Sequence, residues 1–246
     1  KSDVDPAKLD PRARLVTQRR EIYWGEFNWV QATLDSFAQI EREQDYSYLI
    51  NISGQDYPVW SCERILRFLE GAGGKVFLHH AMLGPGGWPE ALDRVEYHHY
   101  YGKSRVRALI SKAVRGVWRL LGLKRTMPDG LTPYGGANWF TLPRAAVAAI
   151  LAFAEANPRF VEFMRTVAIP DEVYFHTILL NSPLRASVVN DNHRYVDWSQ
   201  RLPNPKCLTR GDFEKIAASG KMLCRKIDVR TEGGLLDLLD AGRRDA

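Results

Sequence analysis

Short apolar segments of two kinds alternate along the chain, and this alternation limits the fold more than any other feature of the sequence. Strand-like runs occur at Tyr48–Ile52 and Lys75–His79, whereas apolar residues at helical spacing run through Tyr23–Ile40 and Pro143–Phe153. Strands that alternate with helices are typical of α/β proteins, in which helices cover the faces of a sheet. The sequence therefore predicts an α/β fold.

The second half of the chain continues the pattern. We expect helices at Asp171–Leu180 and Asp212–Ala218, and extended segments at Tyr195–Trp198 and Leu223–Asp228. Ser61 is a plausible N-cap for a helix over Ser61–Leu69, because its side chain can accept a hydrogen bond from the first turn. No linker is long or polar enough to separate two domains, so the sequence predicts one domain over residues 1–246.

The positive charge of the chain is concentrated in one segment. The whole chain carries a net charge of +5, yet residues 103–125 hold eight Lys and Arg and no acid, which leaves −3 for the remainder. Apolar residues recur in this segment at helical spacing, at Val106, Leu109, Ile110, Val114, Val117, Trp118 and Leu121. The pattern predicts a basic amphipathic helix that either contacts an anionic membrane or lays its apolar stripe on the core. Nucleic acid is not an expected partner, since no nucleic-acid-binding motif accompanies the charge.

Other features of the sequence indicate where in the cell the protein is expected. The longest apolar run, Ala145–Ala154, has ten residues, and a membrane-spanning helix needs about 20. The N-terminal residues do not resemble a signal peptide, and the three cysteines have no metal-binding spacing and favour reduced thiols. We therefore expect a cytoplasmic protein, peripheral at the inner face of the membrane.

Two acidic stretches could carry chemistry. Asp56 follows a predicted strand within Ser53–Pro58, where an α/β sheet commonly binds ligands, although Asp and Pro also form ordinary turns. Asp171 and Glu172 follow Pro170 at the predicted start of a helix. They can balance the helix dipole, or one of them can act as a general base.

Two further stretches leave alternatives open. The small residues of Thr132–Phe140 beside Trp139 predict close backbone approach to a flat group such as a sugar, or a tight loop under an aromatic core. Arg225 and Lys226 are adjacent in a predicted strand, so their side chains point to opposite faces. A cation that points inward needs an anionic partner from the protein or from a ligand.

In order and spacing, these pieces resemble the core-2/I-branching N-acetylglucosaminyltransferase family (glycosyltransferase family 14, which includes peptide-O-xylosyltransferases), with this chain a bacterial-type member. The resemblance is carried by Ile22–Gly25, Leu49–Pro58, Gly136–Leu142, Pro170–Glu172 with Phe175 and Thr177, Tyr195–Trp198 and Arg225–Asp228. It implies a GT-A-like fold with a mixed central sheet flanked by helices. The chain begins near the family's Val-Asp motif, at Val4-Asp5, so we expect it to lack the first strand–helix unit.

The resemblance also implies residue roles. Glu172 matches the general base, and Lys226 matches a cation on the donor diphosphate. Arg201 and Lys206 are both candidates for a second cation on the diphosphate. The other donor-side matches are Asp5, Trp24, Asp56 and Arg225, and the acceptor-side matches are Arg94, Trp139 and Trp198. Ile227 stands where the family has Phe.

The implied reaction is an inverting transfer of a GlcNAc, xylose or glucuronic acid type of sugar from a UDP-sugar to a glycan or glycolipid hydroxyl. Neither a metal nor another cofactor is expected, because fixed cations can stabilise the departing diphosphate. The helix dipole would keep Glu172 ionised, with Asp171 as the helix cap. The alternative is a non-catalytic glycan- or membrane-binding module. The presence of both Glu172 and Lys226 favours the enzyme.

Overall fold

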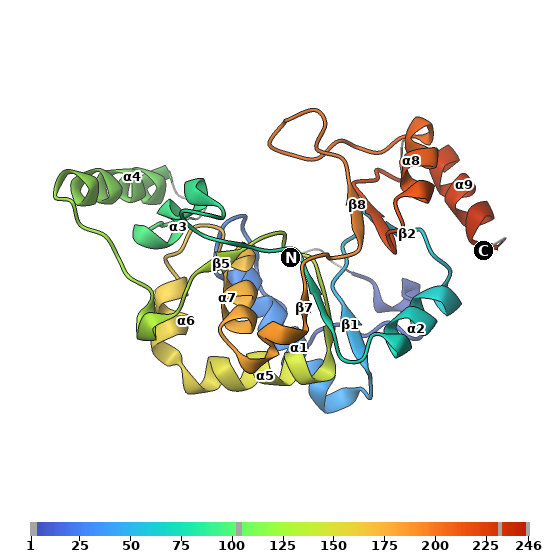
Figure 1. Cartoon of the computed structure of the whole chain (residues 1–246), viewed down its shortest axis with the longest axis horizontal. Coiled ribbons are helices and arrows are strands. Elements are labelled where there is room, and N and C mark those ends of the chain that lie inside the picture. Colours follow the sequence, from blue (N-terminus) through green and yellow to red (C-terminus); the bar gives the residue numbers. More distant parts are fainter. Residues whose placement is uncertain (1–3, 102–104, 231–232, 245–246) are drawn as a thin grey trace. The chain divides into compact units, whose positions relative to one another are not determined.

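The computed structural model describes residues 4–101, 105–230 and 233–244, and the chain divides into two compact units. Unit 1 comprises Lys1–Ser47, His80–Asn138 and Pro143–Val188, and unit 2 comprises Tyr48–His79, Trp139–Leu142 and Val189–Ala246 (Figure 1). Each unit is assembled from segments that are distant in sequence. The single domain expected from the sequence stays a prediction.

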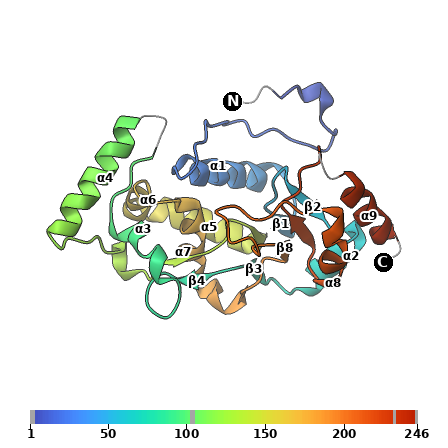
Figure 2. The same cartoon turned by 90° about the horizontal axis from the view of Figure 1, so that it is seen from above.

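Unit 1 is mainly helical. Its helices are α1 (Asn28–Glu43), α3 (Asp93–Glu96), α4 (Arg105–Leu120), α5 (Arg144–Ala156), α6 (Pro158–Met164) and α7 (Tyr174–Leu180). Every residue of α7 is buried, and α5 packs against both α7 and α1 (Figure 2). Strands β4 (Ala81–Met82) and β5 (Tyr134–Gly135) pair antiparallel beside α7. The core of unit 1 therefore lies around α7, directly after Pro170–Glu172.

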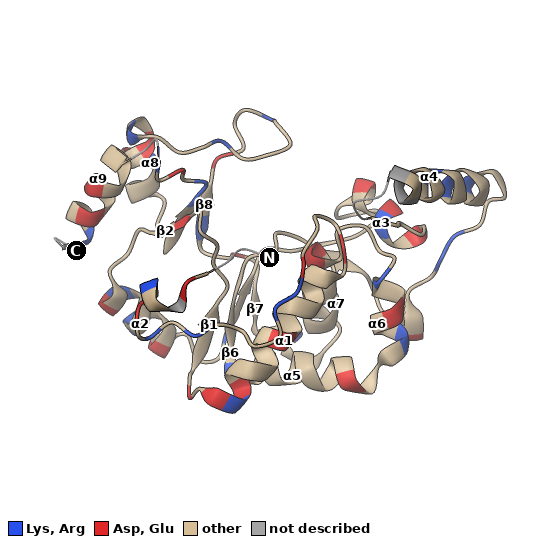
Figure 3. Ribbon diagram, turned by 180° about the vertical axis from the view of Figure 1, so that it is seen from behind, with Lys and Arg blue, Asp and Glu red and all other residues tan. Residues whose placement is uncertain are grey.

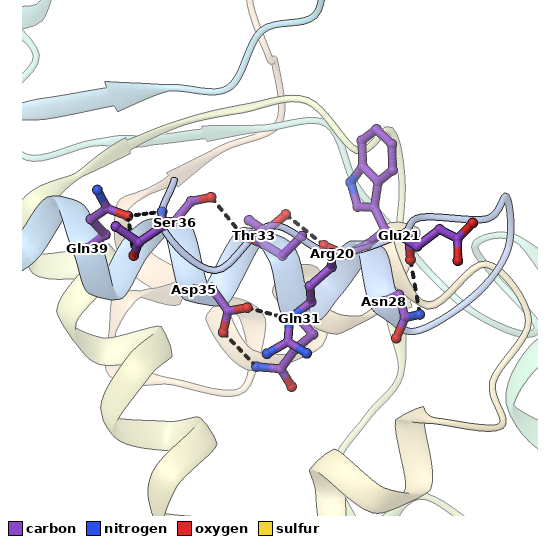
Figure 4. Close-up of polar contacts among 11 residues, drawn as sticks. Arg20, Glu21, Asn28, Gln31, Thr33, Asp35, Ser36 and Gln39 are labelled. Carbon is purple, nitrogen blue, oxygen red and sulfur yellow. Dashed lines mark hydrogen bonds and ion pairs between the residues drawn. The ribbon is translucent and has the colours of Figure 1, made fainter. Parts of the chain in front are cut away.

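The segment before α1 is tied along that helix (Figure 4). Arg20 forms an ion pair with Asp35 of α1, and the Asn28 side-chain amide donates to the Glu21 carbonyl at 3.2 Å. Gln39 accepts a hydrogen bond from the Thr17 amide at 2.9 Å. These contacts hold Thr17, Arg20 and Glu21 against α1.

Unit 2 contains two sheets. One has the order β1-β6-β3-β7, from β1 (Tyr48–Ile50), β6 (Phe140–Pro143), β3 (Val76–Leu78) and β7 (Val188–Val189), with the end of β6 and the start of β7 at the boundary with unit 1. The other has the order β2-β9-β8, from β2 (Asp56–Pro58), β9 (Leu223–Arg225) and β8 (Arg194–Val196). Strand β9 pairs antiparallel with β2 and parallel with β8, so this sheet is mixed. The α/β class is confirmed.

Three helices complete unit 2: α2 (Cys62–Gly71), α8 (Phe213–Ala218) and α9 (Gly233–Arg244). The predicted N-cap of α2 is confirmed, because Ser61 Oγ accepts a hydrogen bond from the Arg64 amide at 3.2 Å. A second core, formed by Leu208, Ile216, Cys224, Ile227, Leu235 and Leu239, joins α8 and α9 to strand β9. Ile227 thus fills an apolar position, as its resemblance to the family's Phe implies.

Two local predictions were wrong. The turn predicted over Ser53–Pro58 ends early, since Asp56–Pro58 forms β2 by pairing with β9. The helix predicted over Asp171–Leu180 is broken. Ile169 has a left-handed backbone with φ 50°, Pro170–Glu172 forms a 3-10 turn, and α7 begins only at Tyr174. Both errors arise because partners distant in sequence decide where hydrogen bonding continues.

In the described residues, no helix has the length and apolar character needed to cross a bilayer. Short 3-10 helices connect the longer elements, at Pro6–Lys8, Pro89–Ala91, Pro128–Gly130, Pro170–Glu172, Pro183–Ser187 and Arg210–Asp212.

Candidate active site

Glu172, the predicted general base, ends a 3-10 turn whose backbone is held at both sides. Its amide donates to the Ile169 carbonyl at 3.1 Å, and its carbonyl accepts from the Gly136 amide at 2.9 Å. Gly135 comes so close that a Cβ there would lie 3.0 Å from the Glu172 carbonyl oxygen and 2.7 Å from Leu83 Cδ1. The small residues at this position are therefore needed for a contact within the protein. This favours the tight-loop interpretation of the stretch over contact with a sugar.

The Glu172 side chain is bound by Arg94. Arg94 Nη1 donates to Glu172 Oε2 at 2.6 Å, and the two side chains are 18% and 30% exposed. Arg94 lies on α3 and stacks over the Trp88 ring at 4.4 Å. Among the described residues no group binds Glu172 Oε1, so the carboxylate has one oxygen oriented by Arg94 and one that can accept a proton.

Asp171 has a different environment from its neighbour. Its Oδ2 accepts a hydrogen bond from Asn138 Nδ2 at 2.9 Å. Burial, and then the nearby Glu172 carboxylate, raise the pKa of Asp171 to about 6. The expectation that Asp171 caps a helix was wrong: Ile169 precedes the 3-10 turn and Val173 precedes α7, and neither end has a side-chain cap.

The expected effect of the helix dipole on Glu172 was wrong as well. Helix α7 has no acid in its first turn, because the 3-10 turn places Glu172 before Val173 and outside that helix. Arg94 supplies the positive charge that the sequence argument assigned to the helix end. An ion pair at this distance is a stronger and more directional interaction than a helix dipole.

Two predicted donor residues also lie in unit 1. Trp24 is 75% exposed, and its ring contacts Tyr101 edge-on with 5.9 Å between centroids. Nearby, Gly25 and Tyr101 help to line a cavity of about 440 Å³, together with Phe27, Tyr100 and Arg165. Asp5 is exposed, and its Oδ1 accepts a hydrogen bond from the Ala7 amide at 3.1 Å.

In unit 2, Asp56 is buried in an ion pair that the sequence did not reveal. Its Oδ1 accepts from Arg194 Nε at 2.9 Å, and its Oδ2 accepts from the Ser53 amide at 2.7 Å. The Arg194 and Asp56 side chains are 0% and 1% exposed. Asp56 therefore joins the turn before β2 to strand β8.

Arg225 is the inward cation that the strand pattern predicted. It lies opposite Asp56 in the β2–β9 register, and its guanidinium stacks 4.0 Å from the centre of the Trp139 ring. Arg194 approaches the same ring at 5.0 Å. Burial lowers the pKa of both arginines, and the charge of Asp56 opposes that shift. Two guanidinium groups thus share one carboxylate and one aromatic ring, with positive charge in excess.

Lys226 follows directly after β9 and is half-buried. Its carbonyl accepts a hydrogen bond from the Leu208 amide at 2.8 Å, which fixes the backbone of this residue. Across the described ranges, no acid lies within ion-pair distance of its ammonium group. Asp228 is engaged by Arg230 at 2.8 Å, and this contact, with a smaller effect of Lys226, lowers the pKa of Asp228 to about 2.

The remaining candidates lie on the loop that follows β8. Trp198 is 54% exposed, and the carbonyl of Trp198 accepts from the amide of Arg201, whose φ is 51°. The base of the loop is closed where the Lys206 amide donates to the Asp197 carbonyl at 2.9 Å. Lys206 Nζ donates to both oxygens of Asp212, at 2.7 and 2.9 Å, which raises the pKa of Lys206.

The structure therefore brings the predicted residues together in separate groups. Arg94 joins Glu172 and Asp171 in unit 1, and Arg225, Asp56 and Trp139 form a cluster in unit 2. Sequence reasoning missed Asn138 as a partner of Asp171, and Arg194 as the partner of Asp56. The one signal in the sequence for this role of Arg194 is its position directly before the extended Tyr195–Trp198 motif. In the part of the chain that is described, no three His, Cys, Asp or Glu side chains are grouped so that they could hold a metal ion.

Comparison with known proteins defines the class of this chain. Xylosyltransferase 2 of Canis lupus familiaris is 27% identical over 202 residues, which cover 81% of this chain and 22% of that protein. Xylosyltransferase 1 of Mus musculus is 26% identical over 193 residues, and that of Homo sapiens is 26% identical over 192 residues, each covering 77% of this chain and 19% of the relative. The chain thus spans about a fifth of the length of these relatives.

The chain is thus similar to xylosyltransferases over this part of their length. A model of the Core-2/I-branching enzyme family matches residues 7–219. The chain belongs to the Core-2/I-branching enzyme family, as its ordered motifs indicated. The match includes Arg94, Glu172, Arg201 and Lys206 and ends before Lys226.

Proposed function

We propose that this chain catalyses inverting transfer of a sugar from a UDP-sugar to a hydroxyl group of a glycan or glycolipid. In such a displacement the acceptor oxygen forms the new bond to the anomeric carbon, the bond to the diphosphate breaks, and UDP leaves with the bonding electrons. The acceptor proton passes to a base. The reaction thus needs a carboxylate for the proton and positive charge for the leaving group.

We assign the base to Glu172. The observation that carries this assignment is its bond to Arg94, which orients one carboxylate oxygen at 2.6 Å and leaves Oε1 without a partner among the described residues. The backbone contacts with Gly135 and Gly136 fix the position of the residue further. A general base must be held in position, and the hydrogen bond from Arg94 serves this requirement. Arg94 is then a positioning residue for the base rather than only a contact of the acceptor.

We assign the stabilisation of the leaving UDP to Lys226 and Arg201. Lys226 follows the cluster of Arg194, Arg225 and Asp56, in which two cations share one carboxylate. Lys206 is a weaker candidate for the second cation, because Asp212 already binds its ammonium group at two oxygens. Arg201 is exposed and forms no ion pair within the described ranges. Fixed cations of this kind stabilise a developing diphosphate charge without a metal.

For contact with the nucleoside of the donor we propose Trp24 and Asp5. The exposed indole of Trp24 has a free face for stacking, and the cavity beside it offers space for a planar base. Trp198 is the better supported acceptor residue, since its ring is half exposed. Trp139 is covered by Arg194 and Arg225, which supports a role in holding those cations.

Turnover with a panel of UDP-sugars tests the proposal. UDP-xylose comes first because the relatives are xylosyltransferases, followed by UDP-GlcNAc and UDP-glucuronic acid. We expect transfer or donor hydrolysis that persists in chelator and falls at least about 100-fold in Glu172→Gln. Glu155→Gln, an exposed acid of α5, is the matched control. Full activity of Glu172→Gln would refute the assigned base, and loss of activity in chelator would refute the metal-free mechanism.

A non-catalytic glycan-binding module is the second candidate. One observation favours it, namely that the Glu172 carboxylate is already engaged in an ion pair, as a purely structural acid would be. Equilibrium binding separates the two functions. A binding module would retain glycan without consuming any UDP-sugar, and Glu172→Gln would lower its thermal stability without changing its affinity for glycan.

A further inference from the structure

Helix α4 directs most of its apolar side chains to solvent. Along α4 and the turn after it, Val106, Leu109, Ile110, Val117, Leu120, Leu121 and Leu123 are all exposed, from 47% at Leu123 to 86% at Leu120. The sequence left open whether this stripe packs on the core. Val114 and Trp118 of that stripe are half-buried, whereas its other five residues are exposed. The exposed row is larger than scattered apolar residues on a monomer surface would give.

The opposite side of α4 attaches it to unit 1. Ser111 is buried, and its Oγ accepts a hydrogen bond from the Tyr100 amide at 3.1 Å. Arg115 Nη1 donates to His99 Nδ1 at 2.8 Å, and the Trp118 ring contacts His98 edge-on at 5.1 Å. The helix is therefore held by a polar and aromatic side. Within the apolar row, Ile110 also lines the cavity beside Gly25 and Tyr101.

A basic row runs beside the apolar row. Lys112, Arg115 and Arg119 recur at helical spacing, and no acid occurs on α4 (Figure 3). Arg119 is paired with Asp93, but Lys112 is exposed with no ion pair among the described residues. Arg115 points toward unit 1, where its Nη1 contacts the buried His99 ring. The exposed surface thus combines the apolar side chains with the uncompensated positive charge of Lys112.

We propose that α4 and the turn to Leu123 dock on the surface of an anionic lipid bilayer. The apolar row would lie at the boundary of the acyl chains, and the ammonium group of Lys112 would lie among the headgroups. Charge complementarity decides between occupants. A second copy of this chain would place two basic rows against each other, and a nucleic acid would leave the apolar row unused. This surface goes beyond the proposed sugar transfer and does not depend on it.

Co-sedimentation of the full chain with vesicles tests the proposal. One set of vesicles contains phosphatidylcholine with about 30 mol% phosphatidylserine, and the other contains phosphatidylcholine alone. We expect binding to the anionic vesicles at least about tenfold tighter than to the neutral ones, and weaker at about 300 mM than at about 50 mM NaCl.

Variants separate the contribution of the apolar row to vesicle binding from that of Lys112. The double variant Leu109→Glu, Leu120→Glu should weaken anionic-vesicle binding at least about tenfold, and Lys112→Glu should weaken it less and reduce its salt dependence. Leu66→Glu, at an exposed leucine of α2, is the matched control and should bind as the unaltered chain does. Thermal melting checks that each variant is folded.

Two results would overturn the proposal. One is equal binding of the unaltered chain and the double variant to anionic vesicles. The other is concentration-dependent self-association in sedimentation velocity that the double variant abolishes, with no vesicle binding, which would assign the surface to a second copy of the chain. Neither result depends on turnover, so the outcome is separate from that of the proposed activity.

Discussion

The guanidinium group of Arg94 binds the carboxylate of Glu172 at 2.6 Å, although 78 positions separate the two residues in the chain. The guanidinium also lies over the Trp88 ring, with 4.4 Å between Arg94 Cζ and the ring centroid. The arrangement makes Arg94 an oriented partner of the proposed base. It also gives Glu172 a compensating charge inside a partly buried site, where an unpaired carboxylate would be costly.

If Arg94 positions Glu172, Arg94→Ala should lower kcat about 10- to 100-fold while the KM for the UDP-sugar changes little. Arg94→Lys should recover part of the loss, because an ammonium group keeps the charge but not the planar geometry of the guanidinium. Steady-state kinetics measures both. Arg159→Ala, an arginine of α6 that is 82% exposed, is the control. An increase in KM alone would assign Arg94 to substrate binding instead.

Gly135→Ala should destabilise unit 1 and lower activity. A Cβ at this position would lie 3.0 Å from the Glu172 carbonyl oxygen, which belongs to backbone and cannot move easily. Overpacking of this kind costs about 1–3 kcal/mol in the free energy of unfolding. Gly71→Ala is the matched control, because a Cβ there meets no atom within 4 Å. Urea unfolding measures the difference, and equal losses in both variants would disprove the close-packing argument.

Asp171→Asn should change the pH dependence of stability. The pKa of Asp171 is raised from 3.8 to about 6 in the folded chain, so the native state binds this proton more tightly than the unfolded state does. The stability contributed by the protonated group is complete below about pH 4 and is lost as the pH rises through about 6. The asparagine variant avoids that loss.

Asp171→Asn should therefore gain about 1–3 kcal/mol over the unaltered chain at pH 7.5, and nearly nothing at about pH 4. Urea midpoints of both proteins at the two pH values measure the effect. A difference independent of pH would show that the pKa of Asp171 is the same in the folded and unfolded chain, and that the amide acts only through its hydrogen bond with Asn138.

Arg201 and Lys206 should respond differently to substitution. Arg201→Ala should lower kcat at least about tenfold without a change in Tm, since the side chain is exposed and would act only on the leaving diphosphate. Lys206→Met should lower Tm, because it removes the ammonium group that binds Asp212. Lys215→Ala, an exposed lysine of α8, serves as the control. If Lys206→Met lost activity at unchanged Tm while Arg201→Ala kept it, the assignment would be reversed.

Asp56→Ala should destabilise unit 2 by about 3–5 kcal/mol, because it leaves the fully buried Arg194 without its counterion. The double variant Asp56→Ala, Arg194→Met should lose less than the sum of the single variants, since it removes both charges. A double-mutant cycle from urea unfolding gives this coupling free energy. Additive losses would show that the two charges do not depend on each other.

Much of the local structure could be predicted from the sequence. The Ser61 cap, the strand around Tyr48–Ile50 and the helix α5 follow from residue types and spacing, which act over a few neighbouring positions. The family could also be identified, because its motifs keep their order along the chain. In contrast, the break between Glu172 and α7 was missed, since the left-handed backbone at Ile169 has no local signature in a β-branched residue.

The residues of the candidate site could be named from the sequence, but the ion pairs that they form could not. Glu172, Arg94, Asp56 and Arg225 were all named from the sequence, but their partners come from segments far away in the chain. Asp56 and Arg194 are 138 positions apart, and the choice of one counterion over another depends on strand register and burial. Local spacing carries no information about either.

Helix α4 shows the same division. The sequence by itself determined an amphipathic, basic helix, because the angular position of each side chain follows from 3.6 residues per turn. Only the tertiary structure decided that its polar and aromatic side attaches to unit 1 and that its apolar row faces solvent. Periodicity fixes which side chains share a face of a helix, whereas the segments folded against that helix decide which face is covered.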